Sequence, residues 1–285
     1  MSILRKIWRV AVDAFWQFNA DDGWAIASHI ALSALMAMFP FFLVLTALAG
    51  IIGSENLADE AANLMLEAWP EEVAGPIARE IHNVLNSAQG QALTVGAALA
   101  LYFASSGVES LRIGLNRAYT VVETRSIWLL RLESIGYVIV SAVALLALSF
   151  LVLLAPLIWT TLVRLFPKLE PFGDFVTVVR LSTATVLLIV PLFVVHKWLP
   201  AGHRTFGQIT PGILATLALW LVAGILFGRY LAEFAFAYSV YYAGLASPMI
   251  ALVFLYLTAS IFIYGGELNA VIAKLRERKI ADAKA

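Results

Sequence analysis

The stretch SIGYVIVSAVALLALSFLVLLAPLIWTTLV, residues 134–163, contains no Asp, Glu, Lys or Arg and decides the fold class of this chain. Three further windows lack all four residue types: 30–54, 205–228 and 234–266. A membrane-spanning helix needs about 20 apolar residues, so each window is long enough to cross a bilayer. Backbone polar groups in lipid must be satisfied within their own segment, and these continuous apolar runs lack the alternation of a barrel strand. The sequence therefore predicts an all-α, polytopic membrane protein.

The overall composition agrees with this class. Hydrophobic residues make up 61% of the 285 residues and charged residues only 13%, whereas soluble domains carry about a quarter charged residues. The formal net charge is zero, so no overall field would recruit nucleic acid. Cysteine is absent, which excludes disulfides, thiolate catalysis and Cys-ligated metal. We expect neither a cofactor nor a metal ion.

The chain divides into a membrane domain and three smaller parts. Residues 1–20 place apolar and basic side chains on opposite sides of a helix, which predicts an amphipathic helix at the membrane interface. The acidic segment 54–91 is expected to form a small helical cap outside the cytoplasm, and residues 276–285 a cytoplasmic tail. The membrane domain, residues 21–275, should contain six transmembrane helices at about 23–53, 92–119, 134–162, 175–198, 206–228 and 245–273.

The distribution of Lys and Arg predicts the orientation of these helices. With six spans and a cytoplasmic N-terminus, most of the basic residues fall in segments on the cytoplasmic side. The opposite orientation would place them outside, against the positive-inside rule. We therefore expect both termini in the cytoplasm of a bacterial cell, with the protein in the inner membrane.

A line of polar residues follows the second span and its extension. Its members are spaced three and four residues apart, which places them on one face of a helix: Tyr102, Ser105, Glu109, Arg112, Asn116, Tyr119 and Glu123. One interpretation is the lining of a polar groove that opens toward the cytoplasm. The other is a solvated cytoplasmic half of the helix.

A second polar group lies near the end of the sixth span, at Glu267 and Asn269. Glu267 follows a long window without charge and precedes the basic tail, so it should lie in the cytoplasmic half of the bilayer. A buried carboxylate needs a partner, and Arg112 or Arg117 is the expected one. The pair would either fix the helix register or provide a titratable group in a transport path.

No catalytic motif occurs in the sequence. We find neither a nucleophile elbow nor a zinc-binding HExxH, a P-loop or a dinucleotide fingerprint. His29 and Ser33 share a helix face, which is more typical of a helix contact than of a ligand. Ser105 or Ser106 with His29 could form a hydrolytic dyad, although this pairing depends on composition alone.

Several stretches resemble the YihY/BrkB family of bacterial inner-membrane proteins over about residues 10–275: ALSAL at 31–35 with Pro40, LYFASSG at 101–107, LNRAY at 115–119 with Arg125, and YGGELNA at 264–270. The residues that match the family motifs are Ser105, Gly107, Asn116, Arg125, Glu267 and Asn269. Members of the family have been labelled ribonucleases, serum-resistance or virulence factors, and lipid transporters. The ribonuclease label does not fit a sequence without a basic nucleic-acid surface, so we do not carry it over.

The resemblance and the polar residues together lead to a functional hypothesis. We expect a transporter that moves a lipid or other amphiphile across the membrane, with membrane lipids as partners and no nucleic acid. The expected substrate-binding residues are Ser105, Glu109, Arg112, Asn116, Arg117, Glu267 and Asn269. The alternatives are a non-transporting envelope scaffold, with a second copy or another envelope protein as its partner, and an intramembrane enzyme.

Overall fold

The structure is a computed structural model that describes residues 3–52, 90–242 and 246–282. Within these ranges every regular element is helical, as the charge-free windows predict. The proposed cap at 54–91 lies outside the described residues except for its last two, which begin a helix. The other domain boundaries stay predictions, although the helix that precedes the tail continues without a break to Asp282.

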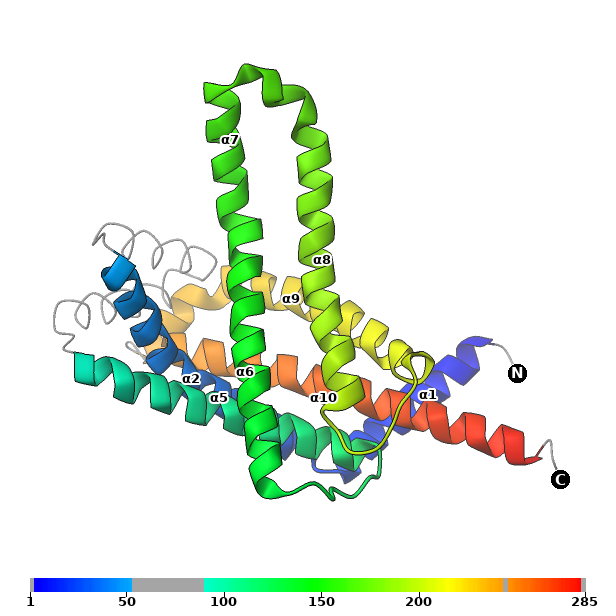
Figure 1. Cartoon of the computed structure of the whole chain (residues 1–285). Helices are drawn as coiled ribbons and strands as arrows, with labels where there is room; N and C mark the ends of the chain where they lie inside the picture. Colours follow the sequence, from blue (N-terminus) through cyan, green and yellow to red (C-terminus); the bar gives the residue numbers. More distant parts are fainter. Residues whose placement is uncertain (1–2, 53–89, 243–245, 283–285) are drawn as a thin grey trace.

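Five helices pack into the main body of the protein (Figure 1). They are α1 (Ile3–Ala20), α2 (Gly23–Ile52), α5 (Gly90–Ala118), α9 (Phe206–Tyr242) and α10 (Ala246–Asp282). The hydrophobic core lies between them and includes Leu115, Ile213 and Ile263, which are at most 1% exposed. Helix α10 contacts each of the other four, so the C-terminal helix is the centre of this body.

Helix α1 is amphipathic, as its sequence predicts. Ala14 and Phe18 are buried, and the helix packs against α10, where the Tyr264 hydroxyl donates to the carbonyl oxygen of Ala11 over 3.0 Å. Ile7 and Trp8 remain exposed. The helix therefore has one face on the protein and an apolar surface that suits a membrane interface.

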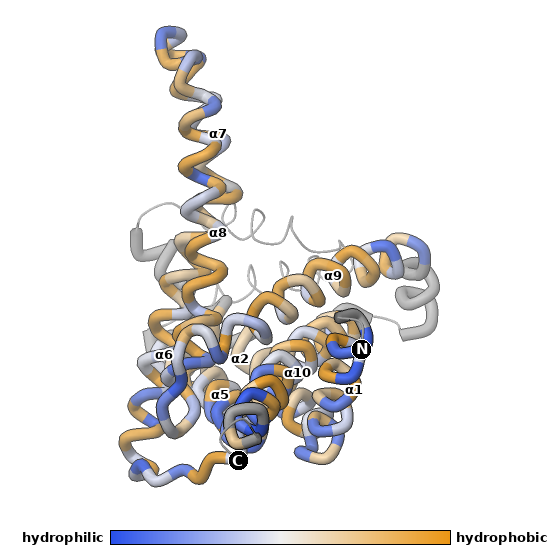
Figure 2. Tube along the Cα trace, turned by 90° about the vertical axis from the view of Figure 1, so that its right-hand side faces the viewer, coloured by the Kyte–Doolittle hydropathy of each residue, from blue (hydrophilic) through white to orange (hydrophobic). Residues whose placement is uncertain are grey.

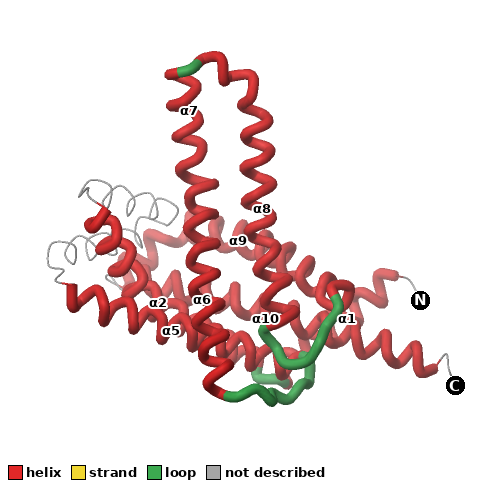
Figure 3. The backbone as a smooth tube through the Cα atoms, viewed as in Figure 1, coloured by secondary structure: helices red, strands yellow, loops and turns green. Residues whose placement is uncertain are grey.

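A long helical hairpin projects from this body (Figures 1 and 3). Its first arm comprises α6 (Ile127–Ser149), the π-helical turn η1 (Phe150–Leu154) and α7 (Ala155–Leu165). The 3₁₀ turn η2 (Pro167–Phe172) leads into the second arm, α8 (Gly173–Trp198). The π turn precedes Pro156, which has no N–H and clashes with the carbonyl one turn earlier, so a regular α-helix cannot continue there.

Among the described residues, four stretches are long and apolar enough to cross a membrane: Ile127–Leu165, Pro167–Trp198, Phe206–Glu233 and Pro248–Arg278. They correspond to the last four of the six predicted spans. In the region of the first predicted span only a shorter apolar helix, Gly23–Met38, is found among the described residues. The hairpin arms are largely apolar, with hydrophilic residues at their far end (Figure 2), and few of their residues are buried within the described part of the chain.

The hairpin does not lie alongside the other helices as a bundle of six parallel spans would require. It stands across α2, α5 and α10 (Figure 1). Ile139 and Val140 on α6 are 55% and 66% exposed. Such apolar side chains are stable in a lipid or protein environment, and the described residues do not cover these two.

Helices α9 and α10 cross at two glycines. A Cβ atom at Gly212 would clash with the carbonyl oxygen of Gly265 and lie 2.5 Å from Asn269 Nδ2. A Cβ atom at Gly265 would lie 2.9 Å from the carbonyl oxygen of Gly212 and clash with Thr216. Only glycine allows the two backbones to approach this closely.

We expect Gly212→Ala to lower the stability of the folded protein by about 1–3 kcal/mol, because the added methyl group overpacks the crossing. The matched control is Gly224→Ala on the same helix, where a Cβ atom would meet nothing within 4 Å. That variant should be neutral or slightly stabilised, since alanine favours helix more than glycine does. Thermal unfolding of the purified proteins in detergent measures both; equal melting temperatures would contradict the close crossing.

Candidate functional site

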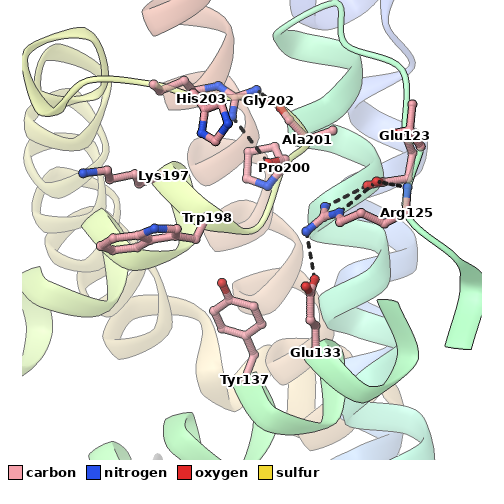
Figure 4. A pocket seen from close by; sticks show the side chains of 12 residues that line it. Glu123, Arg125, Glu133, Tyr137, Lys197, Trp198, Pro200, Ala201, Gly202 and His203 are labelled. Atoms are coloured by element: carbon pink, nitrogen blue, oxygen red, sulfur yellow. Dashed lines mark hydrogen bonds and ion pairs between the residues drawn. The ribbon is translucent and has the colours of Figure 1, made fainter. Parts of the chain in front are cut away.

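Arg125 joins the loop after α5 to the base of the hairpin. Its guanidinium donates to both carboxylate oxygens of Glu123 over 2.9 and 2.8 Å, and to Glu133 on α6 over 2.8 Å (Figure 4). It also donates to the carbonyl oxygen of Leu199, just after α8, over 2.9 Å. A guanidinium that binds a carboxylate with two parallel bonds is geometrically specific. Arg125 therefore holds both arms of the hairpin to the α5–α6 loop.

Two residues of α5 extend this network. Asn116 Nδ2 donates to Glu123 over 3.2 Å, while its Oδ1 accepts the backbone N–H of Ala201 over 2.7 Å. Arg112 Nε lies 3.8 Å from Glu123 and its Nη1 donates to the carbonyl oxygen of Leu130 over 3.4 Å. Both side chains are buried. The amide of Asn116 thus links α5 to the loops before and after the hairpin.

The charge state of Glu123 follows from these contacts. Its hydrogen bonds to Arg125, together with the bond from Asn116, lower the pKa of this carboxyl from 4.5 to about 2, against the opposing effect of burial. The same pairing raises the pKa of Arg125 above its usual value. Both groups are therefore fully charged at physiological pH.

A cleft of about 710 Å³ lies beside this network, at the base of the hairpin (Figure 4). Its charged and titratable lining comprises Glu123, Arg125, Glu133, Lys197, His203 and Arg204. Tyr137 on α6 and Trp198 on α8 contribute aromatic surface from the two arms.

The cations of the cleft differ in their partners. Arg125 pairs with both Glu123 and Glu133, the two acidic residues of the lining, so three cations of the lining face two carboxylates. Lys197 Nζ lies over the ring of Phe206, 3.5 Å from its centroid, and has no acidic partner among the described residues. Arg204 lies 4.0 Å over the ring of Tyr119 and donates to the carbonyl oxygen of Ala201. The cleft therefore retains positive charge that the described residues do not neutralise.

A buried polar network lies behind the cleft, between α5, α8, α9 and α10. The Tyr119 hydroxyl accepts from Asn269 Nδ2 over 3.3 Å and lies 3.4 Å from Nδ1 of the buried His196. Asn269 Oδ1 accepts the backbone N–H of Gly212 over 2.6 Å. This network joins the ends of α5 and α8 to α9 and α10 at the level of the glycine crossing.

The structure distributes the predicted site residues over separate contacts. Arg112 and Asn116 share Glu123, and Asn269 belongs to the buried network. The others lie apart: Glu109 pairs with Arg131 at 2.9 Å, Arg117 pairs with Asp22 at 2.7 Å, and Ser105 donates to the carbonyl oxygen of Tyr102. None of the seven lines the cleft, and their role in substrate binding stays a prediction.

Two expectations, the partner of Glu267 and the place of Glu123 on the helix face, are wrong. Glu267 pairs with neither Arg112 nor Arg117, because these arginines bind Glu123 and Asp22. Glu123 does not share the helix face of the polar line either: α5 ends at Ala118, close to the predicted end at 119, and Thr120 has a φ of 56°. The chain turns back after this residue, so Glu123 reaches Asn116 from a loop.

His29 makes a helix contact, as its place on α2 suggested. Its Nδ1 atom lies 2.6 Å from the hydroxyl of Ser110 on α5, which also donates to the carbonyl oxygen of Ser106. The dyad of His29 with Ser105 or Ser106 that composition alone allowed is not formed, since the hydroxyl that His29 contacts belongs to Ser110.

The comparison with known families agrees with the motifs quoted above. The sequence profile of the family described as virulence factor BrkB matches residues 14–285. The chain belongs to this family. It is 25% identical to the ribonuclease-like protein YfkH of Bacillus subtilis over 281 residues, which cover 97% of each chain. It is also similar to a UPF0761 membrane protein of Rhodospirillum centenum, with 28% identity over 95% of this chain and 58% of that protein. No solved structure matches.

This member of the BrkB family is thus a membrane protein with long apolar helices. The sequence analysis did not identify several of the residues that line its cleft. Glu133, Lys197 and Arg204 come from segments that are distant in sequence and carry no motif. Arg125 was signalled by the family resemblance alone. The predicted line of polar residues ended at Glu123, which is the one member of that line in the cleft.

We expect Glu123→Gln to destabilise the protein by about 1–3 kcal/mol near neutral pH, because it leaves Arg125 without its bidentate partner. The folded-state pKa is lowered, so the contribution of Glu123 is present above about pH 4.5 and is lost as the pH falls toward 2. Thermal unfolding from pH 7 to 2.5 should show the difference between the two proteins shrink over this window. Glu170→Gln, at an exposed position on η2, is the control, and a difference independent of pH would contradict the assignment.

Proposed function

We propose that this protein binds the anionic headgroup of an amphiphile in the cleft and moves the molecule between the leaflets of the bacterial inner membrane. The observation that carries the proposal is the position of the cleft. Two cations without an acidic partner among the described residues, Lys197 and Arg204, lie at the base of a hairpin whose arms expose apolar side chains. An anionic lipid likewise combines a charged headgroup with apolar chains.

The residues of the cleft suit a phosphate or carboxylate group. Lys197 offers an ammonium group without an acidic partner among the described residues, and Arg204 a guanidinium held by backbone carbonyl groups. Trp198 and Tyr137 come from the two arms, at the height where the polar cleft meets the apolar hairpin. Aromatic side chains of this kind favour the boundary between lipid headgroups and hydrocarbon.

The proposal includes the six-span topology with both termini in the cytoplasm. The cleft then lies on the cytoplasmic side, and the η2 turn at the tip of the hairpin lies outside. A single bilayer would require the hairpin to align with α9 and α10, instead of standing across them as in Figure 1. An envelope scaffold is the alternative, in which the hairpin would pack against a partner protein.

Reconstitution in vesicles tests the transport proposal. We expect the wild-type protein to speed the movement of a fluorescent anionic phospholipid between leaflets, and Lys197→Gln to slow it by about tenfold. A charge-assisted contact is worth about 1.5–3 kcal/mol and 1.4 kcal/mol corresponds to a factor of ten. The control Lys168→Gln makes the same change at the far tip of the hairpin and should transport normally.

The same experiment with a zwitterionic phospholipid measures the headgroup preference. Equal rates for the two lipids, or equal rates for Lys197→Gln and the control, would contradict the cleft as the binding site. No movement of either lipid with folded protein would favour the scaffold.

The topology is tested with single cysteines, since the native chain has none. A membrane-impermeant maleimide should label Glu170→Cys at the hairpin tip in intact cells. It should label Val122→Cys, which is 82% exposed in the α5–α6 loop, only after the membrane is opened. The reverse pattern would contradict the cytoplasmic location of the termini.

A further inference from the structure

Glu267 is completely buried on α10 and has no hydrogen-bond donor in the part of the chain that the structure describes. Its exposed fraction is 0%, and both carboxylate oxygens lack a partner. An isolated charge in the interior of a membrane protein is costly, because neither the apolar core nor the surrounding lipid solvates it. This carboxylate therefore needs a hydrogen-bond donor or a positive charge that the described side chains do not supply.

The group beside Glu267 is a second carboxylic acid. The side chain of Asp21, at the junction of α1 and α2, lies within hydrogen-bonding reach of Glu267. The Oδ2 atom of Asp21 is likewise buried and unpartnered among the described residues. Two ionised carboxylates can only accept hydrogen bonds, so a bond between them requires a proton on one of the two. The fold thus brings together buried acceptor oxygens from distant parts of the sequence and leaves a place for one positive charge.

The other charged and titratable groups that the structure describes around the pair do not supply this positive charge. Arg117 on α5 is bound to Asp22 at 2.7 Å. On α10, Lys274 Nζ is exposed and donates to Thr120 over 3.3 Å. Tyr119, after α5, accepts from Asn269, and its other neighbour is His196 of α8. Among the described residues no ion pair involves Glu267.

We propose that Asp21 and Glu267 form a proton-binding site in which the two carboxyl groups share a single proton. One carboxyl donates to the other, as in the carboxyl pairs that share a proton in aspartic proteases. The proton removes one of the two buried charges and supplies the missing donor.

This site is independent of the proposed headgroup cleft, whose lining includes neither acid. The position of the pair connects the binding of a proton to the packing of the helices. Asp21 lies where α1 meets α2, and Glu267 lies two residues beyond the glycine crossing of α9 and α10. Release of the proton would leave two adjacent negative charges and push these elements apart, so a proton gradient could act on the helix packing through this pair.

Infrared spectroscopy of the full-length protein in lipid nanodiscs tests the site directly. In neutral buffer the wild type should show the carbonyl stretching band of a buried protonated carboxyl group. We expect Glu267→Gln and Asp21→Asn each to lose the band, because the new amide N–H supplies the donor and the remaining acid ionises. The control Glu170→Gln should keep it. A wild-type spectrum without the band, or a band that persists in both variants, would overturn the proposal.

Chemical labelling and cation titration test the same pair of acids independently of the infrared band. Carbodiimide reacts with protonated carboxyl groups in apolar surroundings, so peptide mass spectrometry of the wild type alone should find its adduct on Glu267 or Asp21. This keeps the proposal testable if a variant fails to fold, and the absence of any adduct on both residues would overturn it. A melting temperature that rises with sodium or potassium in the wild type, and not in Glu267→Gln, would assign the site to a metal cation and overturn the shared proton.

Discussion

The guanidinium of Arg125 is the contact on which the arrangement of the hairpin depends. It binds the α5–α6 loop through Glu123, the first arm through Glu133 and the end of the second arm through Leu199. At the same base, Leu192 and Leu199 pack into the hydrophobic core of the body, so the charged contact and apolar burial together determine where the hairpin begins. Removing one partner would leave partly buried charges unpaired, which costs more than the pair contributes by itself.

The cleft is a consequence of the same contact. Because Glu123 and Glu133 both pair with Arg125, the remaining cations of the lining have no acidic partner in the described part of the chain. Asn116 holds the loop after α8 by its backbone at Ala201, which places Arg204 and Lys197 at the rim. A structural ion pair and a region available to an anion thus lie side by side and use the same loops.

The body of the protein obeys a second constraint, the contact of backbone with backbone at Gly212 and Gly265. This crossing brings Asn269 close enough to accept the N–H of Gly212, and it aligns α10 so that Glu267 faces the α1–α2 junction. The YGGELNA motif therefore combines two tasks. Its glycines permit the close approach, and its polar residues fill positions that only this approach creates.

The sequence by itself determined the helical membrane class, the ends of most helices and the charge-free windows, because these properties depend on local composition and length. It also indicated Arg112, Asn116, Glu267 and Asn269 as polar groups in an apolar chain. Only the tertiary structure decided their partners. Helical spacing predicts neighbours only while the helix continues, and α5 ends at Ala118. The reversal of the chain at Thr120, the meeting of Asp21 with Glu267 and the convergence of two distant loops on Arg125 are long-range contacts that no periodicity encodes.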